Sequence, residues 1–324
     1  MIWMWIAFIV FVVVMLSLDL GVFHRRAHEI PVREALIWSG VWVGLALAFS
    51  VLIYYLFQYR PWGLVGDGEP SGREAMFLFL SGYIVEESLS ADNIFVIAMI
   101  FSYFAVPAAY QHRVLFWGIL GAIVLRGVMI LVGVVLIQQF SWIMYVFGAF
   151  LIYSAYRMLT ADAMPDPLKN PLVRLMRRFL PMTDTLDGPH FITRRDGRRV
   201  LTPLALVLVA VEGADVIFAV DSIPAIFAIT DVPFIVFTSN IFAILGLRSM
   251  YFALAGILKK FHYLKVSLSV LLGVIGLKML LKDLLHNVPG TTYITLGLIV
   301  VILGAGVVAS VIWAKRHENV AGPQ

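Results

Sequence analysis

Six carboxylates occupy long apolar stretches of this sequence, where a charge has little water to solvate it. They are Glu86, Glu87 and Asp92 in one stretch, and Glu212, Asp215 and Asp221 in another. A charged side chain at the centre of a bilayer costs at least about 2.5 kcal/mol. Each acid is therefore expected to hold a proton or to face a cation. Both states are typical of proteins that move ions, so these residues are the first candidates for chemistry.

Two arginines in apolar stretches, Arg126 and Arg248, are the nearest candidates for partners of these acids. In a purely structural interpretation, Asp92 and Asp215 pair with the two arginines and hold helices together. That pairing leaves four of the six acids without a cation. Glu87 is expected at the outer headgroup level, where water solvates it. In a functional interpretation, the arginines act as gates that compete with a metal ion for the same carboxylates.

The spacing of the acids around Pro224 favours a site made of oxygen ligands. Glu212 and Asp215 are three residues apart and share a helix face, whereas Asp221 lies about 120° further round a regular helix. Pro224 lacks an N–H and disturbs the turn before it, which frees a carbonyl and gives Asp221 a way to converge with the other two.

Neutral oxygen ligands stand close to these acids in the sequence. They are Asn93 and Ser222, with Asn240 as a residue that could line a polar path. Oxygen ligands suit manganese, magnesium or calcium better than copper or zinc. The sequence contains no cysteine, so neither a disulfide nor a thiolate metal site is expected.

The elements that must position these residues are membrane-spanning helices. Hydrophobic residues make up 61% of the 324 residues and charged residues 14%, and the apolar blocks have the roughly 20-residue length that spans a bilayer. The pattern predicts an all-α polytopic membrane protein with nine helices and a retained first span. The expected ranges are 2–22, 36–57, 74–104, 113–138, 141–160, 201–230, 233–258, 264–286 and 291–314.

The distribution of basic residues predicts the orientation. With the N-terminus outside, most of the Lys and Arg residues fall in cytoplasmic segments, and the outer segments hold only Arg60, Arg73, Lys278 and Lys282. Positive charge collects on the cytoplasmic side of membrane proteins. We therefore expect an N-out, C-in protein in an inner membrane.

A threefold match of charged positions predicts an internal repeat. Asp92, Arg126 and Arg157 in one set correspond to Asp215, Arg248 and Lys278 in the other, with separations that differ by one residue. The two sets enter the membrane from opposite sides, so the repeat is inverted, as in many secondary transporters. The expected parts are two first spans (1–73), a first repeat (74–160), a basic cytoplasmic linker (161–200), a second repeat (201–290), and a last span with its tail (291–324). The linker is expected to be solvated, with binding of anionic lipid or a regulator as the alternative.

The two acidic motifs carry a resemblance to a known family. The chain resembles the TerC family of integral membrane proteins, most closely its Alx-type members, in Glu86-Glu-Ser-Leu-Ser-Ala-Asp-Asn-Ile-Phe-Val, in Glu212-Gly-Ala-Asp-Val-Ile-Phe-Ala-Val-Asp-Ser-Ile-Pro-Ala and in the segment from Thr238 to Phe252. The resemblance implies export of manganese(II), with links to alkaline pH response and tellurite resistance. It also implies that the transport ligands are Glu86, Asp92, Glu212, Asp215 and Asp221.

Three classes of function compete at this point. A secondary transporter that exports a divalent metal ion is the leading hypothesis, with exchange for protons as one form of it. A membrane scaffold of a stress-response complex is the alternative, and an intramembrane enzyme is not expected because the sequence has no catalytic motif of that kind. We expect no permanently bound cofactor. The expected partners are the metal ion and membrane lipid, without nucleic acid, and homo-oligomerisation stays open.

Overall fold

The computed structural model describes most of the chain as a bundle of long helices. It describes residues 2–18, 31–66, 68–160, 173–176, 181–183, 185–195, 198–254, 263–285 and 290–321. The helices longer than one turn are α1 (Ile2–Leu18), α2 (Val32–Tyr59), α3 (Gly72–Tyr103), α4 (Ala108–Gln139), α5 (Ile143–Thr160), α7 (Pro203–Phe227), α8 (Pro233–Leu254), α9 (Leu264–Leu280) and α11 (Thr291–Ala321). The other described elements are short helical turns at Pro61–Gly63, at 173–176 and at α10 (Lys282–Leu285), and a β-hairpin of β1 (Ile192–Arg195) and β2 (Arg198–Leu201).

Each of the nine predicted ranges overlaps one of these long helices. The ends differ most in α11, which continues to Ala321 instead of ending at 314, and in α9, which ends at Leu280 instead of 286. α2 and α4 begin several residues earlier than expected, at Val32 and Ala108. Six of the described helices, namely α2, α4, α5, α7, α8 and α11, are long and apolar enough to cross a membrane. α3 has the length but carries three acids in its interior, and α1 and α9 have 17 residues each. The chain is therefore a multi-pass membrane protein, while nine spans and their orientation stay predictions.

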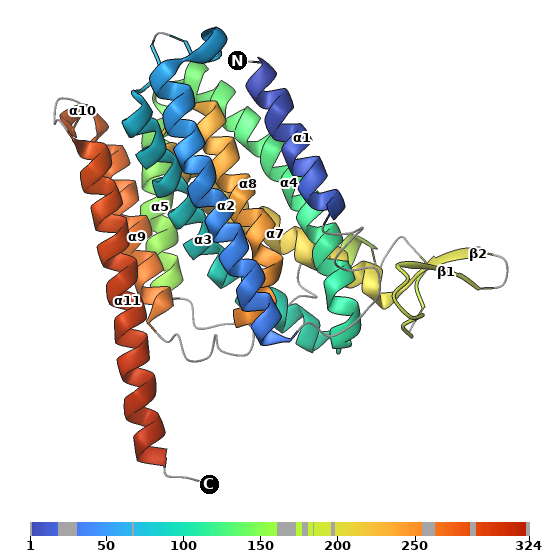
Figure 1. Cartoon of the computed structure of the whole chain (residues 1–324). Coiled ribbons are helices and arrows are strands. Elements are labelled where there is room, and N and C mark those ends of the chain that lie inside the picture. The colour runs from blue at the N-terminus through green and yellow to red at the C-terminus, as the bar shows by residue number, and fades with distance from the viewer. Residues whose placement is uncertain are drawn as a thin grey trace.

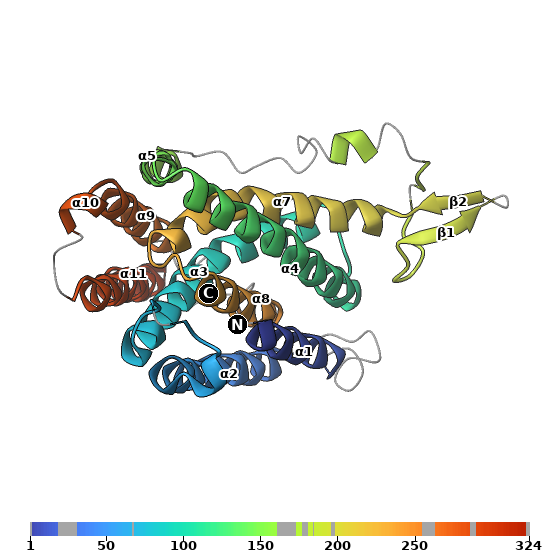
Figure 2. The ribbon, with the colours of Figure 1, turned by 90° about the horizontal axis from the view of Figure 1, so that it is seen from above.

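The packing of the helices places α3 and α8 at the centre of the bundle (Figure 2). α2 packs against both of them, α4 packs against α7 and α8, and α5 packs against α9. α11 lies against α9 and α3 at one edge. α1 starts at one end of the bundle and α11 finishes at the other, so the N- and C-termini lie at opposite ends, and the last turns of α11 extend beyond the bundle (Figure 1).

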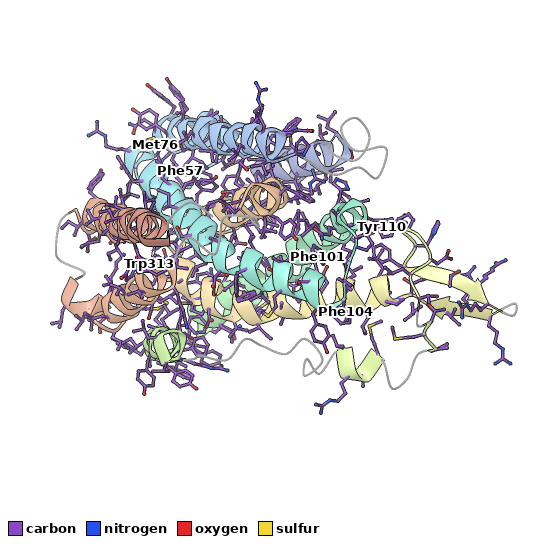
Figure 3. All side chains as sticks on the ribbon, turned by 90° about the horizontal axis from the view of Figure 1, so that it is seen from below. Phe57, Met76, Phe101, Phe104, Tyr110 and Trp313 are labelled. Atoms are coloured by element: carbon purple, nitrogen blue, oxygen red, sulfur yellow. The ribbon has the colours of Figure 1, made fainter. Side chains whose placement is uncertain are left out.

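Apolar side chains form two separate cores. The larger contains a cluster of aromatic rings from α1, α2, α3 and α8, in which Phe49 and Phe242 have ring centroids 4.8 Å apart. The smaller lies where α3 ends and α4 begins, with Phe101 packed edge-on against Tyr251 at 5.5 Å. Figure 3 shows Phe101, Phe104 and Tyr110 gathered at this end of the bundle. The polar residues described below lie among the helices that these cores hold together.

The β-hairpin is the element that the sequence analysis missed. Residues 161–200 were expected to form a solvated linker, and much of that segment lies outside the described residues. Within it, Ile192–Arg195 and Arg198–Leu201 pair as antiparallel strands. The signal was present, because the dipeptide Asp196-Gly197 between the strands is one of the strongest hairpin signals.

Candidate metal-binding site

Arg126 lies at the middle of α4 and is fully buried, with 0% of its surface exposed. Its Nη2 donates to Asp215 Oδ1 at 2.9 Å and its Nε donates to Asp215 Oδ2 at 3.3 Å. Its Nη1 donates to Glu86 Oε1. The guanidinium therefore holds one carboxylate from α7 in a fork and a second from α3, which is the strong geometry for an arginine ion pair.

Two neutral side chains complete this arrangement. Asn240 of α8 donates from Nδ2 to Glu86 Oε2 at 2.9 Å, and its Oδ1 accepts from Arg126 Nη1 at 3.3 Å. Ser222 Oγ lies 3.4 Å from the same Nη1. We call these five residues, Glu86, Arg126, Asp215, Ser222 and Asn240, the Arg126 centre. It joins four helices, and the buried groups satisfy one another's hydrogen bonds, as buried polar networks must.

The helical geometry of α7 explains which of its residues reach this centre. Asp215 and Ser222 are seven residues apart, close to two full turns, and so lie on one face. α7 continues through Pro224 and ends at Phe227. Because the helix stays regular, Asp221 keeps its position about 120° away. The expectation that Pro224 would bring Asp221 together with Glu212 and Asp215 is therefore wrong.

Asp221 faces α5 instead. Its Oδ1 accepts a hydrogen bond of 2.7 Å from Ser154 Oγ, and it interacts electrostatically with Arg157. Asp92 of α3 interacts electrostatically with Asp221 and with Lys265 of α9. We call Asp92, Ser154 and Asp221 the Asp221 site. Sequence reasoning missed Ser154, because a single serine is an ordinary residue of a membrane helix.

Glu212 and Glu87 each have an Oε2 atom that is buried and has no hydrogen-bond partner among the described residues. The carboxylate of Glu212 lies directly against Gly121 of α4, where a Cβ atom would overlap it, and it interacts electrostatically with Asp215. Glu87 faces α8 near Gly246. Glu87 was expected to be a solvated residue at a helix end, and its buried oxygen contradicts that expectation.

Arg248, the second predicted partner, is 7% exposed and lies in α8. Its Nη1 is 3.2 Å from Nε2 of His112 in α4. The pairing hypothesis is thus right for Asp215 in kind, since an arginine holds it, but that arginine is Arg126. It missed Glu86, which also contacts Arg126, whereas Asp92 lies at the Asp221 site.

A cavity adjoins the Arg126 centre between α3, α4, α7 and α8. Asn93 and Asp215 supply its polar lining, and the rest of the wall is apolar and includes Leu115, Gly118 and Ala122 of α4. These α4 residues precede Arg126, so the cavity lies on the side where α4 begins. Asn93 is consequently a cavity residue and is not part of the centre itself.

The oxygens around Arg126 form the kind of set that a hard divalent cation prefers, with two carboxylates, an amide and a hydroxyl. A guanidinium occupies the middle of that set. Within the described residues, no three Asp, Glu or His side chains come close enough together to hold a metal ion. The five predicted metal ligands are divided between the Arg126 centre, the Asp221 site and the position of Glu212, and their role as ligands stays a prediction.

Comparison with known proteins gives a consistent result. Residues 71–319 match the family model described as the integral membrane protein TerC family. The chain is 50% identical over 315 residues to an uncharacterized membrane protein of Myxococcus xanthus, covering 97% of this chain and 93% of that one. It is 48% identical over 321 residues to the putative membrane-bound redox modulator Alx of Escherichia coli K12, covering 98% and 97%. No solved structure matches the chain.

Proposed function

Because the chain belongs to the TerC family of integral membrane proteins, we propose that it is a secondary transporter that exports a divalent metal ion, with manganese(II) as the ion, across the bacterial inner membrane. The observation that carries this proposal is the Arg126 centre. Two carboxylates, an amide and a hydroxyl from three helices converge on one buried cation that a fourth helix supplies. A cation that is part of the protein occupies the position that a transported cation would need.

Charge balance supports competition between Arg126 and the metal ion. Glu86 and Asp215 carry two negative charges if both are ionised, and the guanidinium carries one positive charge. A divalent ion would neutralise both carboxylates and would have to displace the guanidinium to reach them. The oxygen set favours a hard ion over copper or zinc, and the ligands must be deprotonated to bind it.

Glu212 is the residue best placed to couple protons to this exchange. It has a buried oxygen without a hydrogen-bond partner and lies within electrostatic range of Asp215. An acid inside a membrane-spanning helix is expected to hold a proton or to face a cation, and a metal ion at Asp215 would be such a cation. In this proposal Glu212 takes up a proton when the metal ion leaves Asp215 and releases it when the ion returns.

The packing of the helices supports an inverted repeat of α3–α5 and α7–α9. In this repeat, α3, α4 and α5 correspond to α7, α8 and α9. The contact of α3 with α8 therefore corresponds to the contact of α7 with α4, and both contacts are present. Three further contacts each join two corresponding helices, as a twofold relation between the halves requires. They are the contacts of α5 with α9, of α3 with α7 and of α4 with α8, and all three are present. In the predicted N-out orientation, the cavity beside Asp215 lies on the cytoplasmic side of the centre, where an exported ion must enter.

Manganese(II) flux in proteoliposomes tests the proposal directly. We expect uptake or release by the wild-type protein, and loss of flux in Asp215→Asn and Asp92→Asn. Glu74→Gln is the matched control, because Glu74 is an acid in the first turn of α3, away from both polar sites. Each variant is first checked for wild-type elution in size-exclusion chromatography. Wild-type protein without flux under a proton gradient of either sign would overturn the proposal.

The alternative is a membrane scaffold without transport of its own. Several relatives are named as putative redox modulators, and the absence of cysteine from this chain leaves no thiol for such a role here. A scaffold would keep its cellular effect in folded variants that lack the acids. A transporter would lose it together with the flux.

A further inference from the structure

The β1–β2 hairpin stands out sideways from the bundle beyond α4 and the start of α7 (Figures 1 and 2). It carries four arginines within eight residues of sequence, at positions 194, 195, 198 and 199. Neither the Arg126 centre nor the Asp221 site uses it. A short, strongly basic element held at the end of a membrane bundle needs its own explanation.

The base of the hairpin is fixed to the membrane helices. Thr202 follows β2 and precedes α7, and its N–H and hydroxyl donate to the carbonyls of Phe191 and His190 at 3.0 and 2.7 Å. The Arg113 guanidinium of α4 lies over the Phe191 ring, 5.4 Å from its centroid. Thr183 N donates to the Leu201 carbonyl at 2.9 Å. These contacts set the direction of the hairpin relative to α4 and α7.

The arginines face one another across the strands. Arg194 pairs with Arg199, and Arg195 pairs with Arg198. Side chains directly opposite in an antiparallel pair lie on the same face at close range, and like charges there are destabilising. Among the described residues, the side chains of Arg194, Arg198 and Arg199 make no hydrogen bond or ion pair, whereas the Arg195 guanidinium donates to Thr185 Oγ1 at 3.3 Å. The repulsion therefore has no compensation within the described part of the chain.

The two faces of the hairpin differ in character. Alternation along the strands puts Ile192, Arg194, Arg199 and Leu201 on one face, and Ile192 is 55% exposed. The opposite face carries Thr193, whose hydroxyl donates to Asp187, together with Val200 and the other two arginines. Only the first face combines an exposed aliphatic side chain with a pair of arginines that have no described partner.

We propose that the face formed by Ile192, Arg194 and Arg199 docks on the anionic phospholipid headgroups of the leaflet next to it. The paired guanidiniums bind lipid phosphates, and Ile192 lies at the boundary with the acyl chains. Basic side chains beside apolar ones are typical of segments that lie on anionic membranes. This docking is independent of metal transport.

The position of the hairpin favours lipid over a soluble polyanion. Its base is attached to the ends of α4 and α7, and it extends sideways rather than along the bundle axis (Figure 1). A surface held there meets lipid headgroups at high local concentration whatever else is in solution.

Site-specific labelling tests the proposal, because the chain has no cysteine. Ile192→Cys and, on the opposite face, Thr193→Cys each receive an environment-sensitive fluorophore in nanodiscs of neutral phosphatidylcholine or of a mixture with phosphatidylglycerol. Spin-labelled lipid quenches labels at the membrane, and iodide quenches labels in water. We expect phosphatidylglycerol to increase lipid quenching at position 192 by about twofold or more, with little change at position 193. High salt should reverse the increase by screening.

Two double variants distinguish the contributions of the two faces of the hairpin. In the Ile192→Cys background, Arg194→Gln with Arg199→Gln should abolish the increase, and Arg195→Gln with Arg198→Gln should retain most of it. Equal quenching in the two lipid compositions, or equal loss in the two double variants, would overturn the proposal. Protection of the label by added RNA in phosphatidylcholine nanodiscs would also overturn it and would favour a nucleic-acid surface. Wild-type elution of every variant excludes a folding defect as the cause.

Discussion

The two halves of the proposed repeat place equivalent charges in different surroundings. Asp215 of the second half is held in a fork by Arg126 of the first, whereas Asp92, its counterpart, lies near Lys265 and Asp221. Arg126 is fully buried at a junction of four helices, and its counterpart Arg248 contacts His112. Positions that match in sequence thus differ in structure.

The alignment of the charged positions in the two halves also aligns their neighbours in the sequence, and these neighbours differ in polarity as well. It aligns Ser154 with Ile275, and Asp221 with Ala98, so the polar contact of α7 with α5 has an apolar counterpart between α3 and α9. It also aligns Gly121, which accommodates Glu212, with Ala243. The polar chemistry is therefore concentrated where α7 meets α4 and α5. An inverted repeat supplies the frame for transport, but its two halves do not carry equal shares of the polar residues.

Loss of Arg126 should have the largest effect. Arg126→Gln leaves Glu86 and Asp215 buried without their cation, and removing one partner of a buried ion pair costs about 3–5 kcal/mol. Arg248→Gln is the control and should destabilise the protein less. Thermal unfolding in detergent measures both variants, and equal destabilisation would contradict the asymmetry between the halves. Added manganese(II) should stabilise Arg126→Gln more than wild type, because the carboxylates are then free to bind it.

Gly121→Ala introduces the residue that the second half has at the equivalent position. The new Cβ would overlap the Glu212 carboxylate, and overpacking of this kind costs about 1–3 kcal/mol. We expect lower stability together with lower manganese flux. Gly40→Ala is the matched control, because nothing lies within 4 Å of a Cβ there. A Gly121→Ala protein as stable and active as this control would show that Glu212 has room to move.

Ser154→Ala makes the Asp221 site resemble its apolar counterpart. The variant removes the 2.7 Å hydrogen bond to Asp221, and interhelical side-chain hydrogen bonds in membranes contribute about 0.6 kcal/mol on average. A small loss of thermal stability is expected, with a larger proportional loss of flux if Asp221 lies on the ion path. Unchanged flux would place Asp221 outside that path.

Glu69, in the loop before α3, gives a reference for an acid outside the membrane. Burial raises its pKa from the ordinary value of 4.5, Asp231 adds to the rise, and Arg60 opposes it. The folded protein therefore binds this proton more tightly than the unfolded chain does. The stability it contributes is complete below the ordinary pKa and is lost as the pH rises through the raised value. Glu69→Gln should be slightly more stable than wild type at pH 7 and not at pH 4. The reverse order in thermal unfolding would mean that Arg60 dominates.

Much of the fold could be predicted from the sequence because apolar blocks of bilayer length admit few alternatives to a helix. The predicted ranges overlap all nine long helices within the described residues. The hairpin at Ile192–Leu201 was missed because the basic composition of the linker was given more weight than the turn signal at Asp196-Gly197. The acids and the two arginines were found from their improbable positions, but Ser154 and Gly121 look like ordinary residues of apolar helices.

The sequence by itself determined how side chains are spaced around each helix. Asp215 and Ser222 share a face of α7 because they are seven residues apart, and Glu86 and Asp92 are about 120° apart on α3 because they are separated by six. Only the tertiary structure decided which neighbour each face meets. The packing of α3 and of α4 against α7 and α8 brings Glu86 to Arg126 and leaves Asp92 to another site. Periodicity within one helix is a local property, whereas the partner of a buried charge depends on how separate helices pack.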